Sequence, residues 1–260
     1  RTINAVWPVI VNRIRGVPKY VDLFIETYDE INDPMEIQIN HIANAISAFI
    51  IKEWTSFDSP FDEYINGNKD ALTFIQKQGM DLFFGKGKCS SCHSGQLFTD
   101  QKFYALAIPQ FGPGRTRRLD PYTRDVGRMG ESDKLEDMYR FKTPSLRNVS
   151  LTSPYGHNGA YPTLKGIVKH HLKPFEMYKR WEPSMANLPK ADWLRDIDFI
   201  VFSDKREQQR ILSKIDIDRV NLTEKEVDAI VSFLYSLTGK SENNRPLGKP
   251  SSVPSGFLVD

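Results

Sequence analysis

Cys89 and Cys92 are the only two cysteines among the 260 residues, and His93 directly follows the second of them. A lone Cys-x-x-Cys pair can be a redox dithiol, half of a zinc site or an attachment point for haem. The added histidine completes the five-residue signature of c-type haem attachment. In that chemistry the two thiols add to the porphyrin vinyl groups, and the neighbouring imidazole binds the iron from the proximal side.

The alternatives to haem fit the surrounding sequence poorly. A tetrahedral zinc site needs four ligands, and the chain has no second cysteine pair to supply them. A thioredoxin-like motif begins a helix after a strand. Here the motif follows a predicted amphipathic helix over Ala71–Phe84, which Gly85 and Gly87 end. The sequence therefore predicts one covalently bound haem c and, because bacteria attach haem c outside the cytoplasm, a periplasmic location.

The charges of the chain are nearly balanced, with 35 lysines and arginines against 33 aspartates and glutamates. This balance gives no reason to expect a nucleic acid as a partner. No run of apolar residues approaches the roughly 20 residues that span a bilayer, so we expect no transmembrane segment. No basic and apolar leader follows Arg1, so we also expect any targeting signal to be absent from this chain.

Hydrophobic periodicity predicts a mainly α-helical fold with long ordered loops. Glycine and proline pairs such as Gly112-Pro113 indicate that residues 94–140 form one such loop. Thr223 and Glu226 form a capping box at the start of the last predicted helix, which Gly239 ends. The other predicted helices cover Trp7–Ile14, Pro18–Tyr28, the stretch from Asp33-Pro34 to Ile50, and Thr163–Leu172.

Three further motifs accompany the cysteine pair in a fixed order. They are Phe98-Thr99-Asp100, the segment Phe141–Val149 and the segment Leu151–Gly159. Together with Cys89–His93 they resemble the bacterial diheme cytochrome c peroxidase family, which includes a methylamine-dehydrogenase maturation enzyme. The resemblance runs from about residue 1 to the final helix. It implies a cytochrome c-like haem domain.

The resemblance also implies a division of the chain. In the family, an N-terminal domain holds the haem that cleaves hydrogen peroxide, and a C-terminal domain holds a six-coordinate haem that receives electrons. We expect residues 1–68 to be the helical remainder of the N-terminal domain, 69–240 the C-terminal haem domain and 241–260 an extended tail. The family's first Cys-x-x-Cys-His, its tryptophan between the haems and its distal glutamate have no counterpart here. We therefore expect a missing N-terminal haem domain or a partner chain to supply a second haem.

The implied activity is that of a cytochrome-c peroxidase-like oxidoreductase. This chain would be the electron-transfer part of a periplasmic diheme peroxidase that reduces hydrogen peroxide to water, with no catalytic residue of its own. A small cytochrome or a cupredoxin would donate the electrons, and the protein could form a homodimer. Two alternatives stay open, a stand-alone monohaem electron carrier and a diheme enzyme that oxidises a protein or small-molecule substrate.

His171 is the expected second axial ligand of the iron. Leu164, Ile167, Val168 and His171 follow helical spacing and share one helix face, which we expect to meet the haem or the core. His170 lies about 100° away from this face on an ideal helix.

The resemblance points to the same residue. In the family, the sixth ligand lies fourteen residues after the histidine that matches His157, where it is methionine or tyrosine, and that position is His171 here. A histidine in place of methionine lowers the haem potential. The alternatives are His170, Met129 or Met177 as the sixth ligand, or no sixth ligand.

The remaining site predictions also come from the resemblance. His157 matches a family histidine near the haem, so we expect a role next to the haem or at the domain interface, with a structural role in the glycine-rich turn as the alternative. Thr152 and Pro154 match positions whose backbone carbonyls bind an interdomain calcium ion, and carbonyl oxygens are suitable calcium ligands. His41 lies on a predicted helix, where we expect a surface or structural role.

Overall fold

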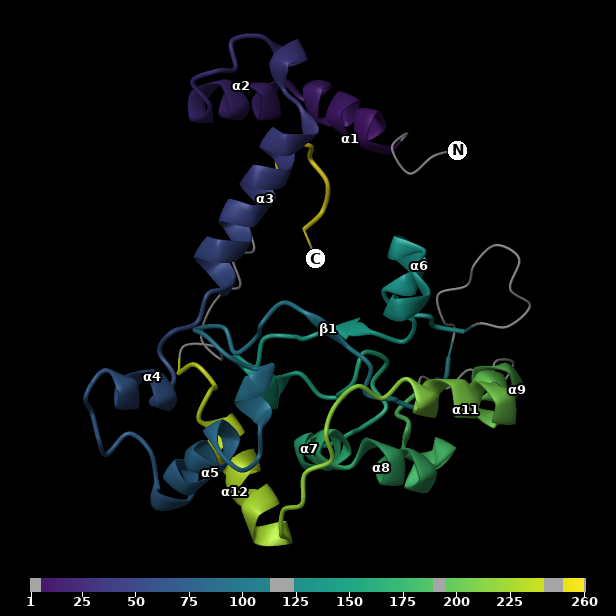
Figure 1. The fold of residues 1–260 in the computed structure, drawn as a ribbon. Coiled ribbons are helices and arrows are strands. Elements are labelled where there is room, and N and C mark those ends of the chain that lie inside the picture. The colour runs from purple at the N-terminus through teal and green to yellow at the C-terminus, as the bar shows by residue number, and fades with distance from the viewer. Residues whose placement is uncertain (1–5, 113–123, 189–194, 241–249, 260) are drawn as a thin grey trace. The chain divides into compact units, whose positions relative to one another are not determined.

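A computed structural model describes residues 6–112, 124–188, 195–240 and 250–259 of the chain (Figure 1). Two compact units can be distinguished, residues 1–57 with 241–260, and residues 58–240. No helix within the described ranges is long and apolar enough to cross a membrane. The predicted tail 241–260 lies partly outside the described residues.

The division between the units precedes the predicted boundary at residue 68. Helix α4 (Pro60–Ile65) belongs to the second unit because Phe61 is part of the main core and its backbone N–H donates to the Ser236 carbonyl. Residues 58–68 therefore fold with the unit that carries the cysteine pair. Which residues correspond to each domain of the family stays a prediction.

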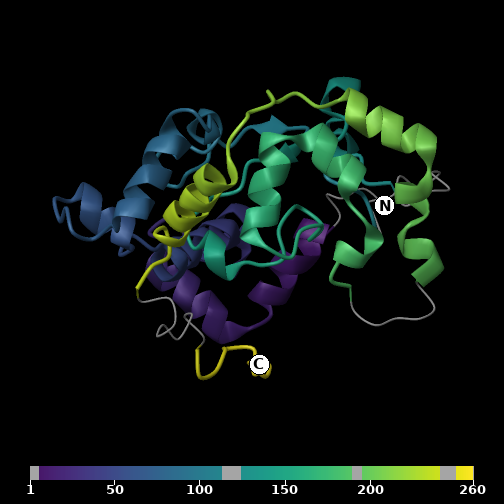
Figure 2. The same ribbon diagram turned by 90° about the horizontal axis from the view of Figure 1, so that it is seen from below.

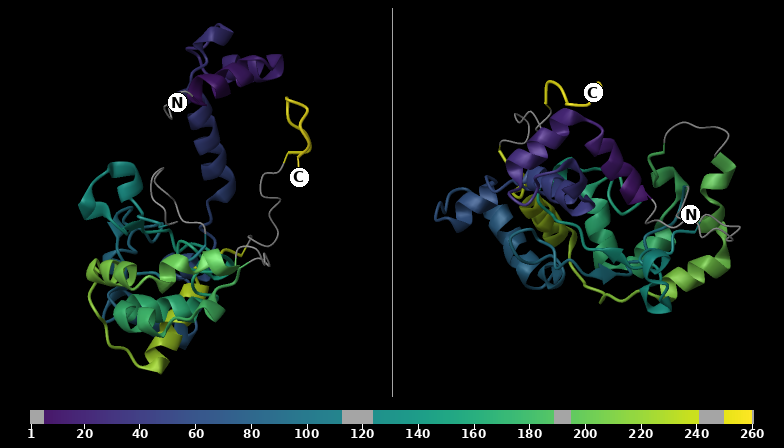
Figure 3. Two further views of the ribbon diagram at one scale, coloured as in Figure 1. Left: turned by 90° about the vertical axis from the view of Figure 1, so that its right-hand side faces the viewer. Right: turned by 90° about the horizontal axis from the view of Figure 1, so that it is seen from above.

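The first unit is built from three helices, α1 (Val6–Arg15), α2 (Pro18–Thr27) and α3 (Ile39–Trp54). Figure 3 shows α1 and α2 beside each other at the start of α3. Helix α3 was predicted to begin at Asp33-Pro34, but Asp33 instead caps a separate 3₁₀ turn, η2 (Pro34–Glu36). A small core joins these elements, and it consists of Val11, Val21, Ile31, Ile37 and Ile42.

The second unit is organised around two helices that lie side by side, α5 (Phe74–Phe84) and α12 (Glu224–Tyr235) (Figures 1 and 2). Both begin at capping boxes, one at Thr73 and the other at Thr223 as predicted. The remaining helices are α6 (Met129–Ser132), α7 (Leu164–Leu172), α8 (Pro174–Arg180), α9 (Arg195–Asp198), α10 (Ile200–Ser203) and α11 (Lys205–Ser213).

Short turns and one small sheet connect these helices. Strands β1 (Phe103–Tyr104) and β2 (Phe141–Lys142) pair antiparallel, with Phe103 opposite Lys142. The prediction of a mainly α fold is confirmed. The segment 94–140, predicted as one loop, instead contains β1, α6 and a 3₁₀ turn, and its residues 113–123 lie outside the described residues. The 3₁₀ turns of this unit are η3 (Cys89–Ser91), η4 (Leu135–Asp137), η5 (Val149–Leu151) and η6 (Pro183–Met185).

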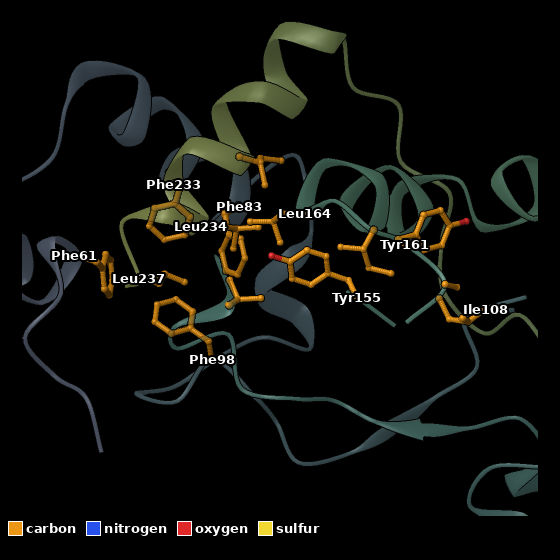
Figure 4. Packing of buried hydrophobic residues seen from close by; sticks show 14 of the residues in the cluster. Phe61, Phe83, Phe98, Ile108, Tyr155, Tyr161, Leu164, Phe233, Leu234 and Leu237 are labelled. Carbon is orange, nitrogen blue, oxygen red and sulfur yellow. The ribbon is translucent and has the colours of Figure 1, made fainter. Parts of the chain in front are cut away.

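Aromatic side chains from distant parts of the chain form the centre of the main core (Figure 4). Phe83 of α5 and Phe233 of α12 lie with ring centroids 5.2 Å apart, and Phe61 contacts Phe233 edge-on at 5.6 Å. Phe98, from the loop after the cysteine pair, contacts Phe61 at 5.3 Å. The core therefore holds the loop of the cysteine motif against α4, α5 and α12.

Gly79 lets α5 and α12 approach closely. A Cβ atom at Gly79 would lie 1.9 Å from the Ala229 carbonyl oxygen, so Gly79→Ala must separate the two helices. We expect a loss of about 1–3 kcal/mol in the free energy of unfolding, measured by urea denaturation. Gly130→Ala on α6 is the matched control, since its nearest neighbour would be Val126 Cγ2 at 3.7 Å. Equal midpoints for the two variants would contradict this account.

Candidate haem site

The cysteine pair lies on a tight turn that begins directly after α5. Gly87 makes this turn possible, because a Cβ atom there would lie 2.7 Å from the Leu82 carbonyl oxygen. Cys89 starts the 3₁₀ turn η3, and its carbonyl accepts the backbone N–H of His93 at 2.9 Å. The two cysteines do not form a disulfide. Burial raises the pKa of the Cys89 thiol to about 12, so this sulfur stays protonated at neutral pH.

His93 is oriented by a backbone carbonyl. Its Nδ1 lies 3.1 Å from the carbonyl oxygen of Phe98, which can only accept a hydrogen bond, so Nδ1 carries the proton. The unprotonated Nε2 is then the nitrogen that could bind a metal. Burial, and after it the nearby His171, lower the pKa of His93 to about 4, which keeps the imidazole neutral at pH 7.

The Phe98-Thr99-Asp100 motif closes the loop that orients His93. Phe98 adopts a left-handed backbone conformation with φ of 52°, which turns the chain back. The Asp100 N–H donates to the Cys92 carbonyl at 2.8 Å, and the Thr99 hydroxyl donates to the Thr143 carbonyl at 2.7 Å. The loop is thus tied both to the cysteine turn and to the Phe141–Val149 motif.

His171 faces His93 across the site. The two ring centroids lie 6.2 Å apart with an interplanar angle of 54°. His171 Nδ1 contacts the Ile167 carbonyl at 2.9 Å, so its Nε2 is also the nitrogen left for a ligand. Two imidazoles that bind one metal ion through bonds of about 2 Å have centroids roughly 6 Å apart. The separation and the donor atoms therefore fit an iron held between the two histidines.

His170 is committed to the protein interior. It is fully buried, its Nδ1 lies 2.7 Å from the Tyr161 hydroxyl, and its Nε2 lies 2.6 Å from the Leu106 carbonyl. Neither nitrogen is left for a metal, which disfavours the alternative ligand. Periodicity had placed His171 on the buried face of α7, but the fully buried residue is His170, and His171 is half-buried with its ring near that of His93.

The two alternative methionine ligands lie in other packing environments. Met177 of α8 packs against the main core, and Met129 is buried at the start of α6. The ring contact with His93 comes from His171.

His41 caps the first turn of α3, where its Nδ1 accepts the Gln38 N–H at 3.1 Å, consistent with the expected structural role.

His157 is held by an aromatic ring and a carboxylate. It stacks on Phe141 with centroids 3.5 Å apart, and its Nε2 lies 3.9 Å from an Asp125 carboxylate oxygen. Burial lowers the pKa of His157 to about 4. These contacts support the structural alternative for His157, and a role next to the haem stays a prediction.

Thr152 and Pro154 lie in an exposed turn after η5. The Thr152 hydroxyl donates to the Val149 carbonyl at 3.1 Å. In the described ranges, no group of three or more His, Cys, Asp or Glu side chains could hold a metal ion. A calcium site made of backbone carbonyls does not need such a group, so calcium at Thr152 and Pro154 stays a prediction.

Two buried polar contacts of this unit were not predicted from the sequence. Arg147 pairs with Asp62 across 85 positions, with Nη1 to carboxylate oxygen distances of 2.6 and 2.8 Å. Glu207 is 1% exposed and accepts from the Tyr139 hydroxyl and from Arg124. Arg147 stands within the Phe141–Val149 motif, but nothing local in the sequence identifies its partner.

Comparisons with known proteins agree with the motifs. The sequence model of a family described as di-haem cytochrome c peroxidase matches residues 2–70. The chain is 36% identical over 168 residues to cytochrome c peroxidase Ccp of Escherichia coli, covering 64% of this chain and 34% of that protein. It is 29% identical over 192 residues to the methylamine utilization protein MauG of Methylorubrum extorquens, covering 68% and 50%.

A solved structure gives the same fold. The diheme peroxidase BthA of Burkholderia thailandensis superposes with a TM-score of 0.58 at 23% identity, covering 95% of this chain and 62% of that one. The predicted cytochrome c-like fold class is thereby confirmed. The chain spans about a third to a half of the length of the curated relatives named above. The matched family model and the curated relatives agree in making the chain similar to members of the di-haem cytochrome c peroxidase family, which include MauG.

Proposed function

We propose that Cys89, Cys92 and His93 hold a c-type haem whose sixth ligand is His171. The observation that carries this proposal is the pair of facing imidazoles, 6.2 Å apart between centroids, each with its Nδ1 engaged by a backbone carbonyl. A bound haem would supply a one-electron iron couple. The chain's own residues would orient both axial nitrogens and attach the porphyrin edge through the two thiols.

The proposed role of this unit is electron transfer within a periplasmic diheme peroxidase. With histidines on both sides, the iron would have no open position for hydrogen peroxide, so the unit would pass electrons and not cleave the peroxide. The reduction of hydrogen peroxide to water would take place at a second haem. A second c-type haem needs its own cysteine pair, which these 260 residues lack, so we place it in a further region or a partner chain.

The electron donor would be a small redox protein, a cytochrome or a cupredoxin. The names of relatives support this class of reaction, since they are cytochrome c peroxidases. The periplasmic location rests on the cysteine motif, because haem c is attached outside the bacterial cytoplasm. An axial histidine in place of methionine would give this haem a low potential.

A haem count set against intact mass tests the proposal. The chain exported to a periplasm that matures c-type cytochromes should carry one covalent haem, measured by pyridine haemochrome and mass spectrometry. Cys89→Ser combined with Cys92→Ser should remove covalent attachment, because no other thiol is present. A Ser90→Ala and Ser91→Ala double variant, in the same turn, should keep it. A wild-type chain without covalent haem contradicts the proposal.

The native protein decides between the proposed peroxidase and a simple electron carrier. Purified from its natural source, the peroxidase should contain two haems, in a longer chain or with a partner chain. A single haem without a partner would instead identify a stand-alone carrier. Rapid peroxide reduction by this chain alone would contradict the closed, six-coordinate site.

A further inference from the structure

We propose that Tyr161 and His170 are positioning residues that fix the rotation of α7 and so direct His171 toward His93. This inference rests on the function proposed above, because it concerns how the sixth ligand is held. The observations that carry it are the two hydrogen bonds of the fully buried His170 ring and the full burial of the Tyr161 side chain.

The hydrogen bonds form one chain with a fixed direction. The Leu106 carbonyl can only accept, so His170 Nε2 carries the proton and donates at 2.6 Å. His170 Nδ1 is then an acceptor, and the Tyr161 hydroxyl donates to it at 2.7 Å. Tyr161 and His170 are both fully buried, so neither group exchanges these partners for water. Loss of either bond would leave a buried polar atom unsatisfied.

The two anchors come from different segments of the chain. Leu106 follows strand β1, and Tyr161 lies just before α7, where its backbone pairs with Tyr155 in both directions at 2.7 and 3.0 Å. Figure 4 shows Tyr161 among the apolar side chains of the main core. Gly166 packs closely on Tyr161, since a Cβ atom there would lie 3.1 Å from a carbon of its ring. Helix α7 is thus held at Gly166 and at His170.

Helix geometry explains why an anchor at His170 controls His171. Neighbouring helical residues are rigidly offset by about 100° and 1.5 Å, so a helix whose residue 170 is fixed presents residue 171 in one direction. A rotation of 20° would move a ring about 6 Å from the helix axis by roughly 2 Å. Metal–ligand distances tolerate only about 0.2 Å. Even a small rotation of α7 would therefore weaken the bond from His171.

The position of His171 within α7 makes such an anchor useful. Helix α7 ends at Leu172, so His171 lies in its last turn, where backbone carbonyls lose their helical partners. The Lys173 N–H does reach the His170 carbonyl at 3.2 Å, and Val220 donates to the Leu172 carbonyl at 2.8 Å. The side-chain bonds of His170 add a connection from this last turn to the interior.

Tyr161→Phe tests the inference with the smallest change, because it removes only the hydroxyl group. In the ferric, haem-loaded chain, cyanide must displace the sixth ligand, so its affinity reports how firmly His171 is held. We expect cyanide to bind about tenfold more tightly to Tyr161→Phe than to the wild type. The matched control is Tyr139→Phe, which also removes a buried phenol hydrogen bond, in this case to Glu207 of α11. Its cyanide affinity should stay within about twofold of wild type.

Each outcome decides one point. If both tyrosine variants change cyanide affinity equally, or if Tyr161→Phe changes nothing, the positioning role is wrong. If His171→Ala keeps the low-spin spectrum, the proposed ligand is wrong and this inference fails with it. If His171→Ala loses that spectrum but Tyr161→Phe is unaltered, only this inference fails. Should Tyr161→Phe not fold, Gly166→Ala, which pushes on the Tyr161 ring, must raise cyanide affinity in the same direction or the inference fails.

Discussion

Replacement of His171 by alanine should convert the ferric haem-loaded chain from a six-coordinate low-spin form to a high-spin form. The expected cause is the loss of the imidazole that faces His93 with centroids 6.2 Å apart. His170 should not take its place, because both of its nitrogens are hydrogen-bonded in the interior. Optical and electron paramagnetic resonance spectra of the ferric protein measure the change.

A His171→Met variant separates the identity of the ligand from its mere presence. Methionine should keep the iron six-coordinate but raise its reduction potential by a measurable part of the roughly 0.8 V that axial ligands span. The matched control is His41→Ala, because His41 caps α3 in the other unit. An unchanged spectrum in His171→Ala, or a wild-type spectrum with the absorption band of methionine ligation, would contradict the assignment.

The parts of the site that could be predicted from sequence are those set by local spacing. Cys89, Cys92 and His93 are brought together by a single turn, and the capping box at Thr223 needs only its own four residues. His171 was singled out by the family resemblance through its distance from His157 along the chain, and its role as a ligand stays a prediction. The residues of the cysteine turn and of the capping box are close neighbours in the chain, whereas His93 and His171 come from distant segments.

Contacts that depend on tertiary packing could not be predicted in this way. His170 and His171 are neighbours with equal claims from residue type alone. Periodicity placed His171 on the face expected to meet the haem or the core, but it did not predict that His170 is the fully buried one. What distinguishes them is the Leu106 carbonyl, 64 positions away, which gives the buried imidazole a partner. The helix start at Asp33 is a similar case. The sequence predicted that an element begins there, but it did not predict that this element is a short 3₁₀ turn and that α3 begins only at Ile39.

The site also shows how the core and the metal ligands depend on each other. Phe98 serves both, since its ring packs on Phe61 and its carbonyl orients His93. A residue that holds this loop should therefore affect stability and haem coordination together. Arg147 is such a residue, because its Nε donates to the Gln96 carbonyl at 2.9 Å and its guanidinium lies 5.5 Å from the Phe98 ring centroid.

Replacement of Arg147 by alanine should therefore cost about 3–5 kcal/mol in the free energy of unfolding. Asp62 and Arg147 have side chains only 6% and 9% exposed, so the variant would leave a buried carboxylate without its cation. Urea denaturation of the haem-loaded chain, followed by circular dichroism, gives the unfolding free energy. The Soret spectrum in the absence of urea should also change, because the loop that orients His93 is held less firmly.

Two further variants identify the cause of that loss. Arg219→Ala breaks a surface ion pair between Arg219 and Glu176, whose side chains are 59% and 33% exposed. It should lower the free energy of unfolding by no more than about 1 kcal/mol. Arg147→Met combined with Asp62→Leu removes both buried charges and should recover much of the loss, because no unpaired charge remains. Recovery should be incomplete, since Asp62 also accepts the Ser59 N–H at the start of α4. If Arg147→Ala costs no more than Arg219→Ala, the buried pair does not stabilise this unit.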